Sequence, residues 1–232
     1  MSYRLPSNTP TILREAGLKV LETPGWQGRG VSLARPYVGV GCHHTATGTG
    51  SSNAAVASLL INGRPDLSGP LSNFGLQRDG TVVIIAAGRC NHGGDARPSG
   101  TVAGGNANDL YASVEAYNDG VGEPWNAVQY NAYVLLAATL SLKITKNSVE
   151  TVRGHKEWSV TGKIDPTFDM NVFRDKVELK MNPPAPKPKP KTRGAKVDRA
   201  IAELKASKAK DPKRAKQIEA AIAELEKVPF LN

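Results

Sequence analysis

The chain of 232 residues is poor in long apolar runs, cysteines, histidines and aromatic residues. No run of eighteen apolar residues occurs, which excludes a conventional membrane-spanning helix. Two cysteines, Cys42 and Cys90, are too few for a disulfide scaffold, and we expect both to be reduced thiols. The first residues form no apolar signal region, so we expect synthesis in the cytoplasm without a secretion signal.

Charge is distributed unevenly along the chain. The formal net charge is +9. Residues 183–232 hold 13 basic and 6 acidic side chains, or +7, whereas residues 1–182 hold 17 and 15, or +2. A basic tail fits an anionic polymer, such as nucleic acid, a membrane surface or bacterial cell wall, although a solvated flexible segment has the same composition. The near-neutral main part lacks an aromatic–basic recognition motif, which argues against sequence-specific nucleic-acid binding.

Composition divides the chain into three parts. Residues 1–182 are long enough for one domain with its own core. Residues 183–196 are rich in proline and lysine and predict an extended linker. Residues 197–232 predict two short basic helices, whose apolar positions are Val197, Ile201, Leu204, Ile218, Ile222 and Leu225. So small a hairpin buries little core, so we expect it to dock on the main domain, to self-associate or to bind a partner such as the cell wall.

The main part has the pattern of an α/β domain. Short β-branched runs predict strands, and an Asp-Gly turn before Thr81 predicts a β-hairpin. Longer segments have apolar residues at helical spacing, such as Ala127, Tyr130, Val134, Leu135 and Ala138. The predicted strands are 38–43, 111–116 and 149–152, the predicted hairpin is 77–87, and the predicted helices are 124–142 and 169–179.

Histidine and aspartate side chains indicate a metal site. His155 and Asp165 can converge on one ion if the ten residues between them fold back as a loop, and Lys163 then lies beside it. His43, at the end of a predicted strand, is the third candidate ligand. Two histidines and one carboxylate commonly hold catalytic zinc, with a fourth position open for water.

Neighbouring residues allow alternatives. Successive side chains on a strand point to opposite faces, so Cys42 and His44 cannot share the pocket of His43, and we expect His44 to be packed or to support the site. His92, in a glycine-containing loop, is either a further ligand or a substrate contact, and we favour the contact because the ligand set is complete. Glu115 faces either water or the site, where it would act as a general base.

Four segments together resemble the zinc N-acetylmuramoyl-L-alanine amidases, which share a fold with the peptidoglycan recognition proteins. The strongest similarity is to the amidase domains of endolysins from phages of actinobacteria. The similarity extends over roughly residues 30–180, and the segments occur in the order found in the family. They are 42–46, 73–81, 91–92 and 154–166.

The resemblance implies a central mixed β-sheet with flanking helices, and it assigns roles to particular residues. Zinc would be held by His43, His155 and Asp165, where some members have cysteine in place of the aspartate. Lys163 matches the catalytic lysine, and Glu115 matches the catalytic glutamate of one branch. Ser72 stands where other members carry a tyrosine. The predicted substrate contacts are Asn73, His92 and Trp158.

The implied function is hydrolysis of the amide between N-acetylmuramic acid and the first L-alanine of the peptidoglycan stem peptide. A phage endolysin of this kind would wait in the host cytoplasm, reach the wall after release and lyse the cell. The alternative is a protein that binds peptidoglycan without cutting it. Such relatives have usually lost a zinc ligand, whereas all three candidate ligands are present here.

Overall fold

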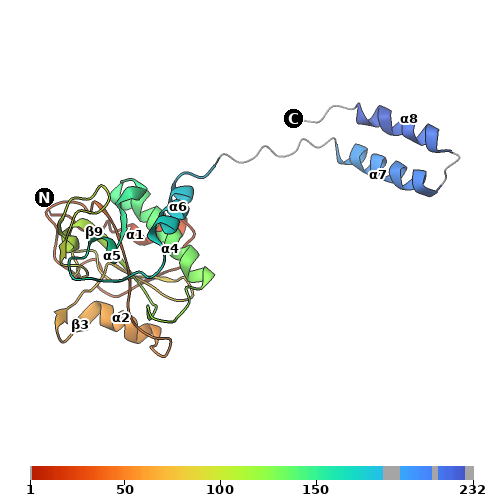
Figure 1. The fold of residues 1–232 in the computed structure, drawn as a ribbon. Helices are drawn as coiled ribbons and strands as arrows, with labels where there is room; N and C mark the ends of the chain where they lie inside the picture. Colours follow the sequence, from red (N-terminus) through yellow and green to blue (C-terminus); the bar gives the residue numbers. More distant parts are fainter. Residues whose placement is uncertain (1, 185–193, 211–213, 228–232) are drawn as a thin grey trace. The chain divides into compact units, whose positions relative to one another are not determined.

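The computed structural model describes residues 2–184, 194–210 and 214–227 (Figure 1). The chain forms two compact units, Met1–Pro184 and Ala185–Asn232. Most of the predicted linker, residues 185–193, lies outside the described residues. Within the described ranges, no helix is both long and apolar enough to cross a membrane.

A six-stranded mixed sheet forms the centre of the first unit, which confirms the predicted fold class. Its strand order is β1-β6-β5-β9-β2-β10. Strands β5 and β6 pair antiparallel on either side of the predicted Asp-Gly turn, although β5 lies before the predicted range of 77–87. The other neighbouring strands pair in parallel. The strands are β1 (Val20–Glu22), β2 (Gly39–His44), β5 (Phe74–Leu76), β6 (Val82–Ile84), β9 (Tyr111–Ala116) and β10 (Val152–Gly154).

The strand predicted at 149–152 begins later than expected. Residues Val149–Thr151 form a 3-10 turn, and the strand β10 starts at Val152. The backbone N–H and the hydroxyl of Thr151 both donate to the carbonyl oxygen of Ser148, at 3.1 and 2.8 Å. This local turn competes with sheet pairing, as side chains of this type commonly do. The β-branched residues of the segment had suggested a strand throughout.

Three helices cover one face of the sheet with the largest apolar core. They are α1 (Thr9–Glu15), α4 (Ala127–Leu140) and α6 (Met170–Met181) (Figure 1). Two predicted helices begin later than expected because a side chain caps each start. Asn126 accepts from the N–H of Gln129, and Asp169 accepts from the N–H groups of residues 171 and 172. After α4 the chain continues as a π-helical turn, Ser141–Thr145.

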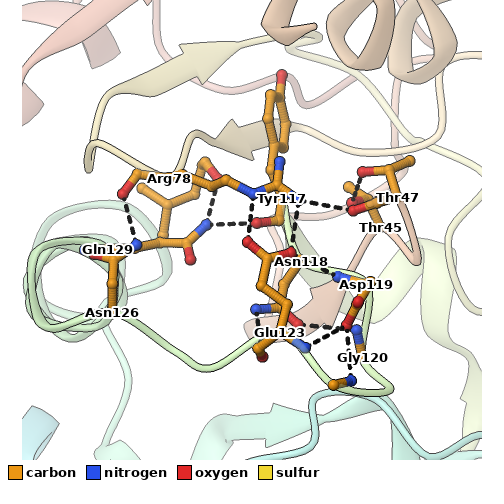
Figure 2. Close-up of polar contacts among 12 residues, drawn as sticks. Thr45, Thr47, Arg78, Tyr117, Asn118, Asp119, Gly120, Glu123, Asn126 and Gln129 are labelled. Atoms are coloured by element: carbon orange, nitrogen blue, oxygen red, sulfur yellow. Dashed lines mark hydrogen bonds and ion pairs between the residues drawn. The ribbon is translucent and has the colours of Figure 1, made fainter. Parts of the chain in front are cut away.

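The inward face of α4 is rotated relative to the predicted one. The apolar spacing had included Ala127, which is exposed, and Tyr130, which is half-buried. Gln129 and Tyr133 are fully buried instead. The Gln129 amide donates to the carbonyl oxygens of residues 76 and 117 (Figure 2), so a polar residue points inward without an unpaired donor.

The opposite face of the sheet has two smaller cores. The helix α2 (Asn53–Asn62) packs Val56 and Leu60 against β6. A second cluster gathers around Tyr111 and Trp158. The remaining elements of this unit are β3 (Gly63–Arg64), β4 (Leu67–Ser68), β7 (Asp95–Ala96), β8 (Gly105–Asn106), α3 (Ala107–Leu110) and α5 (His155–Trp158).

The second unit contains the predicted helical hairpin. Its helices are α7 (Ala195–Lys210) and α8 (Ala215–Glu226), so the first helix begins two residues before the predicted boundary at 197. The six predicted apolar residues form its small core, in which Ile201, Ile218 and Ile222 are buried. Ion pairs join the helices through Lys205 and Glu226, at 3.4 Å, and through Lys208 and Glu219.

Candidate metal centre and cleft

Strand direction brings the candidate site residues together. Strands β2, β9 and β10 run in parallel, so their carboxyl ends share one edge of the sheet. His43 on β2 pairs in register with Glu115 on β9, so both side chains point to the same face. Gly154 on β10 pairs with Cys42, which places His155 level with His43. Cys42 points to the other face and lies in the main core.

The three predicted ligands meet at one point. The Nδ1 atoms of His43 and His155 lie 3.1 Å apart. The Oδ2 atom of Asp165 lies 2.9 Å from the first nitrogen and 3.2 Å from the second. Asp165 returns to this point because the N–H of Lys156 donates to its carbonyl oxygen, at 2.8 Å. The segment from His155 to Asp165 thus folds back as predicted, although its first four residues form the helix α5.

This donor set fits a divalent metal such as zinc. Two imidazole nitrogens and one carboxylate oxygen are ordinary zinc ligands, and all three residues are buried. Bonds of about 2.0 Å to a tetrahedral ion imply ligand–ligand distances of about 3.3 Å. The observed triangle of 2.9, 3.1 and 3.2 Å is close to one face of that tetrahedron. A fourth position would lie on the open side.

Electrostatics favour the protonation states that metal ligation requires. Burial lowers the pKa of the His43 ring to about 4, so the ring is neutral near pH 7. Burial would raise the pKa of the Asp165 carboxyl, but its hydrogen bonds to His155 and His43 outweigh burial, and its pKa is well below the usual range. A neutral imidazole beside an ionised carboxylate is ready to bind a cation.

Trp158 lies buried against the rings of His43 and His155, whereas a substrate contact was predicted from the sequence at this position. It is fully buried. Its ring stacks on Tyr111 at 4.4 Å between centroids and lies 5.4 Å from His155 and 5.5 Å from His43. A Cβ on Gly41 would lie 3.1 Å from the indole, so glycine on β2 leaves room for this packing. Trp158 therefore fixes ring positions and does not line the cleft.

Asn73, the other predicted substrate contact from these motifs, makes hydrogen bonds within the sheet. It is fully buried. Its amide nitrogen donates to the carbonyl oxygens of Ala86 and Gly88, and its oxygen accepts from the N–H of Ser113 at 2.9 Å. Asn73 thus links the hairpin β5–β6 to β9. The neighbouring Ser72, in place of the family tyrosine, is buried and donates to the carbonyl oxygen of Phe74.

A cleft of about 680 Å³ opens beside the metal centre. His92, Glu115 and Lys163 all line it, together with His155 and Asp165. Lys163 lies at its exposed mouth. Its further lining residues come mainly from α2, the β3–β4 hairpin and two loops, and include Leu59, Leu60, Arg64, Leu67, Leu71, Asp119, Val121 and Ile164. None of these lining residues was predicted from the sequence.

Glu115 has the environment expected of a group that transfers protons. The residue is partly exposed to the cleft, but its Oε2 atom is buried and has no hydrogen-bond partner among the described residues. Burial, followed by the nearby charge of Asp165, raises the pKa of this carboxyl well above its usual value, and the charge of Lys163 opposes the shift. A carboxyl with a raised pKa can both accept and return a proton near neutral pH.

A network around Arg78 holds two loops of the cleft wall (Figure 2). The Arg78 Nη2 atom donates to the carbonyl oxygen of Thr47 at 2.8 Å and to a carboxylate oxygen of Glu123 at 2.7 Å. The Asp119 Oδ1 atom accepts from the N–H groups of Val121, Gly122 and Glu123. The loop after β2 and the loop after β9 are therefore tied to each other through one guanidinium group.

His44, which we expected to be packed or to support the site, packs against this loop. It is buried, lines the cleft and lies near the Trp125 ring, at 6.5 Å between centroids. Gly120 has a φ of +73°, and a Cβ there would lie 2.1 Å from the His44 Nε2 atom. The loop can approach the ring this closely because residue 120 is glycine.

Tyr133 is a supporting residue that was not predicted from the sequence. From α4, its hydroxyl accepts from the backbone N–H of His43 at 2.9 Å and lies 3.0 Å from the carbonyl oxygen of Val114. It therefore joins the ligand-bearing strand to the strand that carries Glu115. A tyrosine among the apolar residues of this helix was the available signal in the sequence.

Comparison with known proteins identifies relatives of this arrangement. The sequence model of the N-acetylmuramoyl-L-alanine amidase family matches residues 34–168, which include all three candidate ligands, Glu115 and Lys163. No curated protein matches the chain in sequence.

Solved structures show the same fold. PlyL is 17% identical, with a TM-score of 0.52, and the match covers 70% of this chain and 98% of PlyL. The catalytic domain of XlyA is 20% identical, with a TM-score of 0.51 and coverage of 69% and 99%. A mutant endolysin from Bacillus subtilis is 21% identical, with a TM-score of 0.50 and coverage of 69% and 99%.

Proposed function

Because this chain belongs to the N-acetylmuramoyl-L-alanine amidase family, whose members act on peptidoglycan, we propose that it cuts the amide between N-acetylmuramic acid and L-alanine in a zinc-dependent reaction. The convergence of His43, His155 and Asp165 beside the cleft carries the zinc part of this proposal. The family match covers the whole of that site.

The proposed zinc ligands are the Nδ1 atoms of His43 and His155 and a carboxylate oxygen of Asp165. Bound zinc would polarise the scissile carbonyl and lower the pKa of a water molecule toward neutrality. The chain supplies the geometry for this chemistry, because Trp158 and Tyr133 hold the ligand-bearing segments in place before metal arrives. Measuring the activity of the protein loaded with zinc or with another divalent metal would distinguish between these metals.

Glu115 and Lys163 are the proposed catalytic residues. Glu115 accepts a proton from the attacking water at its carboxylate and then returns it to the leaving amine of the alanine. Lys163, at the mouth of the cleft, places its ammonium charge near the negative oxygen that forms on the attacked carbonyl. Tyrosine assistance is not part of the proposal, since Ser72 occupies the corresponding position.

The proposed biological role is that of a phage endolysin, which reaches the wall from the host cytoplasm after release and lyses the cell. An endolysin from Bacillus subtilis has the same fold. The unit at 197–232 would then bind an anionic wall component, with the linker at 183–196 giving it reach. Self-association through α7 and α8 is the alternative role of this unit, because its apolar core is small.

Mass spectrometry of digested peptidoglycan tests the activity. Purified peptidoglycan is incubated with the protein, with and without a metal chelator, and with zinc added back. We expect free stem peptides that begin with alanine, which disappear on chelation and return with zinc. Disaccharide-peptides with new reducing ends would instead mean a glycosidase and would refute the site.

A binding protein without catalysis is the second candidate. The apolar cleft wall formed by Leu59, Leu67 and Leu71 could hold a muramyl-peptide without cutting it. The same digestion separates the two candidates, because retention on peptidoglycan without any released peptide, at several metal concentrations, would favour binding alone. The complete ligand set favours the enzyme.

A further inference from the structure

We propose that His92 is a positioning residue that accepts a hydrogen bond from the metal ligand His43 and thereby sets the affinity of the site for zinc. The inference rests on the metal site of the proposed function. It adds a role beyond the substrate contact predicted from the sequence, because His92 both lines the cleft and touches a ligand ring.

The two nitrogens of the His43 ring face different partners. Its Nδ1 atom lies 2.9 Å from Asp165 and 3.1 Å from His155, at the point where the ligands converge. Its Nε2 atom, on the far side of the ring, lies 3.0 Å from the Nδ1 atom of His92. The rings of His43 and His92 are nearly perpendicular, at 80°, with centroids 5.0 Å apart.

Metal ligation assigns the direction of this hydrogen bond. A neutral imidazole that offers Nδ1 to a cation carries its proton on Nε2. The His43 Nε2–H group therefore donates, and the His92 Nδ1 atom accepts. Metal-binding histidines almost always donate their second N–H to an outer partner, most often a carboxylate, a carbonyl or water. Here that partner is a second imidazole, and the proton of His92 must then be on its own Nε2.

The loop that carries His92 is held firmly enough to fix the ring. The Asn108 Oδ1 atom accepts from the backbone N–H groups of His92 and Gly93, both at 2.8 Å, and from that of Gly94 at 3.3 Å. A Cβ on Gly93 would lie 2.7 Å from Ala107, so the loop lies directly against α3. His92 itself is buried, at 8% exposure. Its acceptor is therefore in place before metal binds.

Two substitutions separate positioning from simple packing. His92→Leu fills much of the volume without an acceptor, whereas His92→Asn places an amide oxygen close to the position of the original Nδ1. Asn91→Ala is a matched control, since Asn91 lines the same cleft from the same loop but donates to the carbonyl oxygen of Ser68 and touches no ligand. The readouts are zinc affinity, by competition with a chromophoric chelator, and the melting temperature of the metal-free protein.

We expect His92→Leu to weaken zinc binding by about 10- to 100-fold, in the range found for outer-shell partners. His92→Asn should recover most of the zinc affinity, and Asn91→Ala should retain all of it. The metal-free variants should have the same melting temperature. Unchanged zinc affinity in His92→Leu would overturn this inference alone. Failure of the unsubstituted protein to bind zinc would instead overturn the metal site of the proposed function.

If His92→Leu does not fold, the hydrogen bond from His43 to His92 can be tested in the unsubstituted protein. Nitrogen-15 spectra of the zinc-loaded protein should show the His43 proton on Nε2, with a hydrogen-bond coupling to His92 Nδ1. A His43 ring protonated on Nδ1, or a ring without that coupling, would overturn the proposal.

Discussion

In the proposed mechanism Glu115 transfers a proton, and the burial of its carboxyl also has a cost to stability. Its Oε2 atom is buried without a hydrogen-bond partner among the described residues, and burial raises the pKa of the carboxyl group. We expect Glu115→Gln to lower kcat by about 10²- to 10⁴-fold, because the general base is lost. Zinc affinity should persist, since the glutamate is not a ligand. Kinetics on a muramyl-peptide, with a chelator-competition measurement, checks both expectations.

The raised pKa of Glu115 also predicts how stability depends on pH. Above about pH 4.5 the unfolded chain loses this proton while the folded protein keeps it, so stability falls as pH rises through the folded pKa. Glu115→Gln should therefore stabilise the metal-free protein near neutral pH, by about 1–3 kcal/mol, and change it little near pH 4. If the unsubstituted protein and Glu115→Gln were equally stable at both pH values, burial would not disfavour the charged carboxylate of Glu115.

Two glycines in one loop give a matched test of the cleft wall. Gly120→Ala places a methyl group into the His44 ring at a φ of +73°, whereas a Cβ on Gly122 meets nothing within 4 Å. We expect Gly120→Ala to destabilise the protein by about 1–3 kcal/mol, and Gly122→Ala to have little effect. Denaturant unfolding measures both. Similar losses in the two variants would mean that the contact with His44 is not the cause.

Residue types and spacing predicted which side chains would converge. They did not predict which side chains would point into the cleft and which into the core. His43, His155 and Asp165 were predictable because ligand chemistry restricts the residue types and a fold-back loop sets their spacing. Asn73 and Trp158 belong to the same motifs, yet both are buried as structural supports. A motif marks residues that the site depends on, and the direction of a side chain follows only from the packed sheet.

At the scale of elements, Arg78 joins three loops that the chain order keeps apart. It lies in the β5–β6 turn and bonds to the loop after β2 and the loop after β9 (Figure 2). We expect Arg78→Lys to raise KM several-fold with a smaller change in kcat, because lysine cannot replace the forked contacts that hold the cleft wall. Stability should fall by about 1–3 kcal/mol. Steady-state kinetics and denaturant unfolding check these values.

Arg14→Lys is the control for that substitution. Arg14 pairs with Glu22 at 2.9 Å, but both side chains are exposed, at 49% and 37%. Exposed pairs contribute little, so stability should change by less than about 0.5 kcal/mol. Equal effects at the two arginines would mean that the Arg78 network does not hold the cleft.

The bounds of helices and strands could be predicted where the apolar pattern agrees with the local structure. The buried face of a helix could not be predicted where polar residues point inward. The strand β9 matches its predicted range, 111–116. The face of α4 was misplaced because Gln129 and Tyr133 are buried through hydrogen bonds to strands that are distant in sequence. Such long-range partners are invisible to periodicity within the helix.

At the scale of the whole molecule, charge and catalysis belong to different parts of the chain. Residues 183–232 carry +7 of the net +9, and the first unit contains the complete candidate site. We expect deletion of 185–232 to leave hydrolysis of a soluble muramyl-peptide unchanged and to reduce retention on intact walls. Wall binding by the full chain should weaken as salt rises, because salt screens exposed charge. Pull-down assays at graded salt, beside the peptide assay, separate the two activities. Undiminished wall binding by the shortened chain would assign retention to the cleft, and loss of peptide hydrolysis would show that α7 and α8 support the catalytic unit.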